Sequence, residues 1–153
     1  DMRVGEIDLM NRRIRRNRSK TKVLTDHKLW PMTIELLKQT GRFEAGLNER
    51  VFLSRFGRPL VSEDYRNDKL LRSDGIRTMF EKLRKKVGLE AGRGFYTLRK
   101  TAATEIERID PLVTEMFLGH VERGMKKHYA GRDWKRLDMA IMELRQRFDL
   151  DDE

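Results

Sequence analysis

Tyr96-Thr97-Leu98-Arg99-Lys100-Thr101-Ala102-Ala103-Thr104, residues 96–104, is the stretch on which the fold prediction depends. Two short segments follow it along the chain, Leu118-Gly119-His120 and His128-Tyr129. Each segment alone is ordinary, because an arginine often opens a helix, Gly-His often ends one, and a tyrosine in a basic loop is usually a surface residue. Their order and spacing carry the information: His120 comes 21 residues after Arg99, and Tyr129 follows nine residues later.

The segment that begins at residue 96 has the apolar period of an amphipathic helix. Thr97 is its expected N-cap, since a threonine hydroxyl can accept a bond from a free backbone N–H group. The apolar side of this helix carries Leu98, Ala102, Ala103, Ile106 and Ile109.

Further helices are predicted on both sides of this one. One begins at Pro31 and ends at Thr40-Gly41, one is capped by Asp74 and ended by Gly88, one covers residues 111–118 with Pro111 first, and one begins near Asp133. The last helix carries an apolar stripe that either packs on the core of this chain or docks on a neighbouring subunit; its residues are Leu137, Ile141, Leu144 and Phe148.

The first part of the chain contains a basic run from Arg12 to Lys22. The run contains the β-branched Ile14, and Val23-Leu24-Thr25 follows it. Together they predict a two-stranded ribbon with Lys20 near the tip. Residues 51–53 are expected to form a short strand or a buried turn, and residues 61–72 a loop. The fold class is therefore α+β: mainly helices, with a small antiparallel sheet near the N-terminus.

Composition limits the functions that this chain can have. The 153 residues include 34 Lys and Arg against 25 Asp and Glu, a formal net charge of +9, which favours a polyanionic partner such as nucleic acid or an anionic membrane. The absence of cysteine excludes disulfides and thiolate chemistry, and three histidines make a metal site unexpected. Neither a signal peptide nor an apolar run of about 18 residues is found. We expect a cytoplasmic single domain over residues 1–153, without cofactor or metal and not in a membrane.

At the spaced Arg99, His120 and Tyr129, the sequence resembles the tyrosine recombinases, which include the integrases of phages and other mobile genetic elements. Residues 98–104 are similar to the family's "LRHTFAT" segment, and Ser19-Lys20-Thr21 to the tip of its basic hairpin. Residues 51–60 are similar to its segment with a Gly-x-Pro ending, and the resemblance runs from about residue 8 to residue 147. It implies site-specific DNA recombination or integration on double-stranded DNA, by a homotetramer in the full-length protein.

The resemblance also implies roles for individual residues. Tyr129 is the expected nucleophile, which stores the energy of the broken phosphodiester bond in a 3′-phosphotyrosyl link. Arg99 and His120 are expected to stabilise the charge of the transition state, and Lys20 to protonate the leaving 5′ oxygen. The expected DNA-binding residues are Arg13, Arg15, Arg18, Lys22 and Lys100.

Two departures from the family pattern keep alternatives open. Tyr96 occupies the position of a usual histidine, and a phenol with a pKa near 10 accepts protons poorly at neutral pH. Arg3 has the local form of the family's first catalytic arginine, but the strand expected at residues 6–9 follows it too closely. Either about ten residues are deleted, or Arg3 is a chance match and the true arginine lies upstream of this chain. In both cases we expect the first helices of the domain and the separate DNA-clamping domain to be absent from these residues. The chain is then either an active recombinase domain or an inactive DNA-binding remnant.

Overall fold

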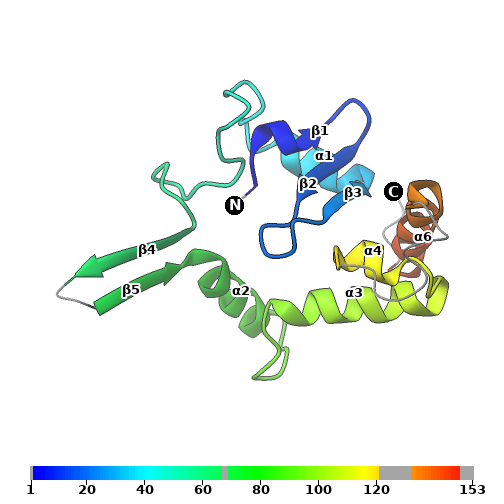
Figure 1. Ribbon diagram of the computed structural model, residues 1–153. Coiled ribbons are helices and arrows are strands. Elements are labelled where there is room, and N and C mark those ends of the chain that lie inside the picture. The colour runs from blue at the N-terminus through cyan, green and yellow to red at the C-terminus, as the bar shows by residue number, and fades with distance from the viewer. Residues whose placement is uncertain (1, 67–68, 121–131, 149–153) are drawn as a thin grey trace.

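The computed structural model describes residues 2–66, 69–120 and 132–148 of the chain (Figure 1). Its first half contains a short 3₁₀ turn, three strands and one helix. These are η1 (Val4–Glu6), β1 (Ile7–Asp8), β2 (Arg13–Asn17), β3 (Leu24–Lys28) and α1 (Pro31–Lys38). The strands form an antiparallel sheet in the order β1-β2-β3. The predicted ribbon is therefore confirmed, with one additional strand at its edge.

The second half is mainly helical, as expected for an α+β fold. It contains β4 (Val61–Arg66), β5 (Lys69–Asp74), α2 (Gly75–Lys86), α3 (Tyr96–Ile109), α4 (Thr114–Leu118) and α6 (Trp134–Arg147). In Figure 1, α2 and α3 run below the three-stranded sheet, α4 lies above α3, and α6 lies at the far end of α3. The tip of the β2–β3 hairpin points down from the sheet toward α3 and α4.

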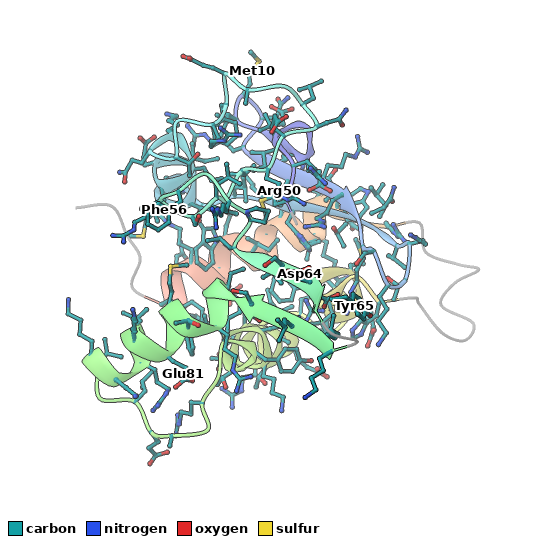
Figure 2. The ribbon with its side chains drawn as sticks, turned by 90° about the vertical axis from the view of Figure 1, so that its left-hand side faces the viewer. Met10, Arg50, Phe56, Asp64, Tyr65 and Glu81 are labelled. Atoms are coloured by element: carbon teal, nitrogen blue, oxygen red, sulfur yellow. The ribbon has the colours of Figure 1, made fainter. Side chains whose placement is uncertain are left out.

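Residues 61–72, expected as a loop, instead begin the antiparallel hairpin of β4 and β5. The two strands are in register, with Tyr65 opposite Leu70. This hairpin projects from the body, and Figure 2 views the molecule from that side. The prediction failed because most side chains on both faces of the ribbon are exposed, so the sequence lacks the apolar alternation of a half-buried strand. Residues 51–53 form neither the expected strand nor a buried turn: Val51 is buried, Phe52 is 43 % exposed, and Leu53 makes an isolated bridge to Pro59.

Helix starts follow local capping chemistry at two of the predicted positions. Asp74 accepts a bond from the N–H of Arg77, and Asp133 accepts one from the N–H of Arg136, both at 2.9 Å. The prediction of Thr97 as a cap was wrong: its backbone N–H donates to the carbonyl of Gly94, and α3 begins one residue earlier.

The start predicted for α4 at Pro111 was also wrong. The side chain of Asp110 accepts a bond from the N–H of Leu112, and its carbonyl accepts one from the N–H of Val113. These bonds close a turn over residues 110–113, so α4 begins only at Thr114.

The larger core cluster joins α6 to α3 and α4. It consists of Ile106, Val113, Met116, Leu137, Ala140, Ile141 and Leu144, each at most 8 % exposed. The first three residues of the apolar stripe on α6 thus pack inside this chain, whereas Phe148 is 39 % exposed and meets the Trp30 ring edge-on. The indole N–H of Trp30 donates to the carbonyl of Ile141 at 2.9 Å, which ties the segment before α1 to α6.

The apolar side of α2 contrasts with this core. The spacing of residues 76–87 predicts burial of one face, but Met79, Leu83 and Val87 are each more than half exposed. Phe80 makes an edge-to-face contact with Phe95, at 5.5 Å between ring centroids. The first residue of α2 is also tied to the rest of the chain, since the N–H of Gly75 donates to the carbonyl of Leu60 at 2.7 Å.

Candidate active site

The site is built around the turn Leu118-Gly119-His120 at the end of α4. Gly119 has a positive φ of 61°, and the N–H of His120 returns to the carbonyl of Glu115 at 2.9 Å. A Cβ atom at Gly119 would lie 2.6 Å from Cγ2 of Thr25 on β3. Both the backbone conformation and the close approach to β3 therefore require glycine here.

Arg99 reaches this turn from the first part of α3. Its Nη2 donates to the carbonyl of Leu118 at 2.6 Å, and the residue is half-buried. Because α4 returns alongside α3, Arg99 lies beside Leu118, 19 positions later in the sequence. The structure thus brings Arg99 to the turn that carries His120.

His120 is oriented by its own helix. Its Nδ1 lies 2.9 Å from Oε2 of Glu115. Because Nδ1 is engaged in this way, Nε2 is the ring nitrogen that can contact a ligand. The side chain is 40 % exposed, which allows a phosphate to approach it.

The tip of the β2–β3 hairpin docks on the same turn. Oγ1 of Thr21 donates to the carbonyl of Gly119 at 3.1 Å, and Nη1 of Arg18 donates to it at 3.3 Å. Lys20, between these two residues, is exposed. The hairpin tip, Arg99 and His120 therefore meet although about 100 residues of sequence separate the tip from the turn.

A cavity of about 240 Å³ opens where these elements meet. Its lining residues are Arg16, Arg18, Ser19, Thr25, His27, Arg99, Phe117 and Leu118. Three guanidinium groups in so small a space favour an anion. Burial lowers the pKa of His27 below its usual value of 6.5, so the imidazole is neutral near pH 7.

Arg99 is the one expected catalytic residue that lines this cavity among the described residues, and Lys20 and His120 are close in sequence to residues in its lining. Arg3 and Tyr96 have other surroundings. Arg3 donates from Nη1 to the carbonyl of Asn48 at 2.8 Å, pairs through its backbone with Arg50, and is not among the described residues that line the cavity. Tyr96 opens α3, is 63 % exposed, and has Nζ of Lys100 5.7 Å from its ring centroid. Tyr129 and His128 lie outside the described residues.

The expected DNA-binding residues differ in how they are placed. Arg13 is largely buried between β2 and α6, where it donates to Asp138 at 2.7 Å and to Asp26 at 2.5 Å, and these hydrogen bonds raise its pKa. By contrast, Arg15 is 65 % exposed, and Lys22 and Lys100 are also exposed.

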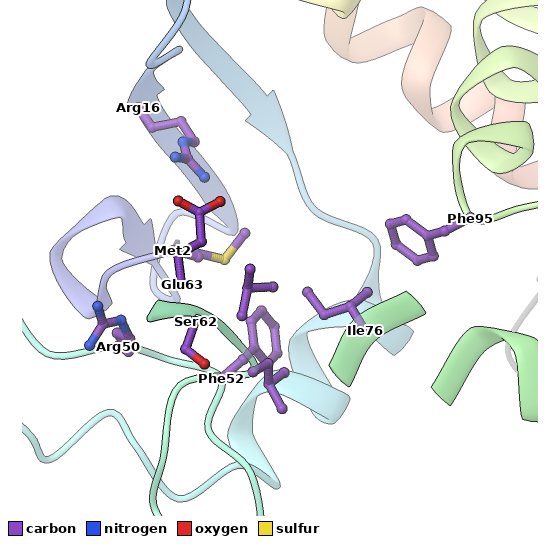
Figure 3. A pocket seen from close by; sticks show the side chains of 10 residues that line it. Met2, Arg16, Arg50, Phe52, Ser62, Glu63, Ile76 and Phe95 are labelled. Atoms are coloured by element: carbon purple, nitrogen blue, oxygen red, sulfur yellow. The ribbon is translucent and has the colours of Figure 1, made fainter. Parts of the chain in front are cut away.

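A second, larger cavity of about 700 Å³ lies between the sheet and the β4–β5 hairpin (Figure 3). Figure 3 shows Arg16 pointing from β2 toward the carboxylate of Glu63, with Phe52 and Ile76 on the apolar side. Arg16 lines both cavities, and it also lies 3.6 Å from the carboxylate of Glu6.

Some of these positions escaped prediction from sequence. Thr21, Thr25 and Glu115 each contact the Leu118–His120 turn or the residues beside it. Thr21 lies in the Ser-Lys-Thr segment, which is the one signal that could have indicated it. In the part of the chain that the structure describes, no group of three or more His, Asp or Glu residues could hold a metal ion, and no helix is long and apolar enough to cross a membrane.

The geometry agrees with a comparison of the sequence with known families. The chain belongs to the phage integrase family, which it matches over residues 1–136, a range that includes Arg99, His120 and Tyr129. Members of this family are tyrosine recombinases, and the α+β fold is consistent with their catalytic domain. None of the curated proteins or solved structures matches the chain significantly.

Proposed function

We propose that this chain is the catalytic domain, or a large part of it, of a site-specific recombinase that cuts and rejoins duplex DNA through Tyr129. One observation carries the proposal. Arg99 and the hairpin tip bind the carbonyls of two adjacent residues, Leu118 and Gly119, directly before His120. Arg99, the hairpin tip and the end of α4 therefore line one small cationic cavity, which suits a single phosphate, and His120 directly follows that end of α4.

In the proposed reaction, the phenol oxygen of Tyr129 attacks the scissile phosphorus. A bond forms between that oxygen and phosphorus, the bond from phosphorus to the 5′ oxygen breaks, and the phenol proton passes to solvent. The ammonium group of Lys20 gives its proton to the departing 5′ oxygen, a step worth about 10²–10⁴ in rate. Since one phosphodiester replaces another, a 5′-hydroxyl can reverse the step and rejoin a strand without ATP.

Arg99 and His120 would stabilise the negative charge that develops on the non-bridging oxygens. A guanidinium suits this role because it holds two oxygens in a fork and keeps its charge. Removal of one such donor costs about 10²–10³ in rate. The position of Arg3 against Asn48 favours a second candidate function, DNA binding without cleavage, because the family needs an earlier arginine at the phosphate.

Duplex DNA is the proposed partner, bound across the face that carries the hairpin tip, in the cytoplasm and by a tetramer of the full-length protein. The exposed cations Arg15, Lys22 and Lys100 support this surface, together with Arg18 at the cavity. Arg13 is left out of it, because two carboxylates already neutralise its charge inside the fold.

The test is the capture of a covalent adduct on a nicked or 5′-phosphorothiolate DNA site, detected as a shifted band after denaturation. The chain has three tyrosines, so Tyr129→Phe can be matched with Tyr65→Phe, which changes an exposed residue on β4. We expect adduct with the unmodified chain and with Tyr65→Phe, and none with Tyr129→Phe. An adduct that persists in Tyr129→Phe refutes the nucleophile. Retained DNA without any adduct from the unmodified chain favours the binding remnant.

A further inference from the structure

The hairpin tip is a loop closed by its own backbone hydrogen bonds. The N–H of Lys22 donates to the carbonyl of Arg18 at 2.7 Å, and the N–H of Arg18 donates to the carbonyl of Val23 at 2.9 Å. Lys22 has a positive φ of 55°, which turns the chain back toward β3. Lys20 therefore stands in a loop whose backbone is already fixed by its own bonds, so whatever orients the loop also orients Lys20.

Two side chains attach this loop to the rest of the site, and they are not equivalent. Arg18 donates to the carbonyl of Gly119 at 3.3 Å, but its charged group also lines the cationic cavity and can turn to a phosphate. Thr21 donates to the same carbonyl at 3.1 Å through a neutral hydroxyl, which a phosphate attracts less. When DNA is bound, the Thr21 bond is therefore the one expected to remain.

We propose that Thr21 is a positioning residue: its hydroxyl holds the hairpin tip on the carbonyl of Gly119 and so places Lys20 beside the phosphate. The Thr21 bond is well placed to hold the hairpin tip. Gly119 directly precedes His120, and Leu118 before it accepts a bond from Arg99. The Thr21 bond, beside that of Arg18, thus links the loop that carries Lys20 to the backbone turn that carries His120. The assignment of Lys20 as that donor rests on the proposed function.

The contact is tested first in the free protein, without DNA. Thr21→Val removes the hydroxyl at nearly constant shape, and Thr21→Ser is the matched control that keeps it. Amide hydrogen exchange at Arg18 and Lys22, whose bonds close the tip, should accelerate about three- to tenfold in Thr21→Val, the equivalent of one net hydrogen bond. Thr21→Ser should exchange as the unmodified chain does. Equal amide exchange rates in all three proteins would overturn the claim that the Thr21 hydroxyl holds the hairpin tip on Gly119.

The purpose of the contact is tested with two DNA substrates in single-turnover cleavage. One has an ordinary 5′ oxygen at the scissile phosphate, and the other has a 5′ sulfur, which leaves as a thiolate and needs no proton. Thr21→Val should slow cleavage of the ordinary DNA by about 10–10²-fold, part of the full effect of a general acid, and leave the sulfur substrate nearly unchanged. Lys20→Met gives the largest loss of the same kind and serves as the reference.

The possible results separate this proposal from the proposed function. Equal slowing on both substrates means that Thr21 acts on DNA binding or on the fold, which overturns the positioning role. Cleavage of the sulfur substrate by the unmodified chain, together with a substrate-dependent loss in Thr21→Val, supports it. Cleavage of neither substrate by the unmodified chain refutes the proposed function and the role of Thr21 in it, while the exchange rates still decide whether the contact exists.

Discussion

Gly119→Ala is expected to be among the most damaging small substitutions in this chain, and its cost can be divided into two parts. The first part is conformational, because alanine in the left-handed region costs about 1–2 kcal/mol relative to glycine. The second is steric, since the new Cβ would lie 2.6 Å from Cγ2 of Thr25, about 1 Å inside ordinary carbon–carbon contact. Thr25 is 7 % exposed, and its hydroxyl donates to the carbonyl of Arg16, so its side chain cannot rotate away freely.

Overpacking of this kind costs about 1–3 kcal/mol, so the total expected loss for Gly119→Ala is about 2–5 kcal/mol. Gly88→Ala is the matched control, because Gly88 also has a positive φ, 72°, but nothing lies within 4 Å of its added Cβ. It should lose only the conformational part, about 1–2 kcal/mol. Urea unfolding followed by circular dichroism measures both values.

A double substitution isolates the steric part. Thr25→Ser removes Cγ2 and keeps the hydroxyl that bonds Arg16, and alone it should cost about 1 kcal/mol for one lost methyl group. In the presence of Thr25→Ser, Gly119→Ala should cost about 1–3 kcal/mol less than it does alone. Strict additivity, within about 0.5 kcal/mol, would refute the claim that β3 and the Gly119 turn are in contact.

Two further predictions concern the partly buried side chains of Arg13 and His27. Arg13→Met should lower the free energy of unfolding by about 2–4 kcal/mol, because it leaves Asp26 and Asp138 without their shared cation. Arg15→Met should cost less than about 1 kcal/mol, because Arg15 is 65 % exposed and lies 3.5 Å from Asp26. Equal urea midpoints for the two variants would contradict the structural role of Arg13. Burial lowers the pKa of His27 in the folded chain below the value of 6.5 that it has when unfolded. As the pH falls through about 6.5, the unfolded chain therefore binds a proton that the folded chain does not bind. The free energy of unfolding should fall with pH in this range. His27→Phe should reduce this dependence between about pH 7.5 and 5.5 in thermal unfolding, and an unchanged slope would assign the effect to another group.

The features that could be predicted from sequence depend on chemistry within a few residues. Asp74 and Asp133 cap their helices because an aspartate can bond the N–H three residues later, wherever the helix lies in the fold. The β2–β3 hairpin was predicted for a similar reason, from its β-branched strands and polar tip. At Thr97 the same local rule failed, since Gly94 and Phe95 already begin the turn that leads into α3.

The features that could not be predicted depend on contacts between distant segments. The bond from Thr21 to the carbonyl of Gly119 joins residues 98 positions apart, and no local pattern encodes it. The hairpin of residues 61–74 was missed because its strands are stabilised by pairing rather than by a buried face. The opposite error occurred at α2, where a clear apolar spacing indicated burial but Met79 and Leu83 remain more than half exposed.

The three-residue turn at the end of α4 explains why the site residues occur in their particular order along the chain. The left-handed conformation of Gly119 reverses the backbone. The carbonyl of Leu118 therefore accepts a bond from Arg99, and the carbonyl of Gly119 accepts one from Thr21. Arg99 can bind the first carbonyl only if α3 and α4 are antiparallel neighbours, and this sets the separation of 21 residues between Arg99 and His120. The hairpin can bind the second carbonyl only if the turn lies against β3, and the close approach to Thr25 excludes every residue except glycine. The Leu-Gly-His segment is thus the junction of three chain segments, and the separation between Arg99 and His120 follows from the bonds that meet there.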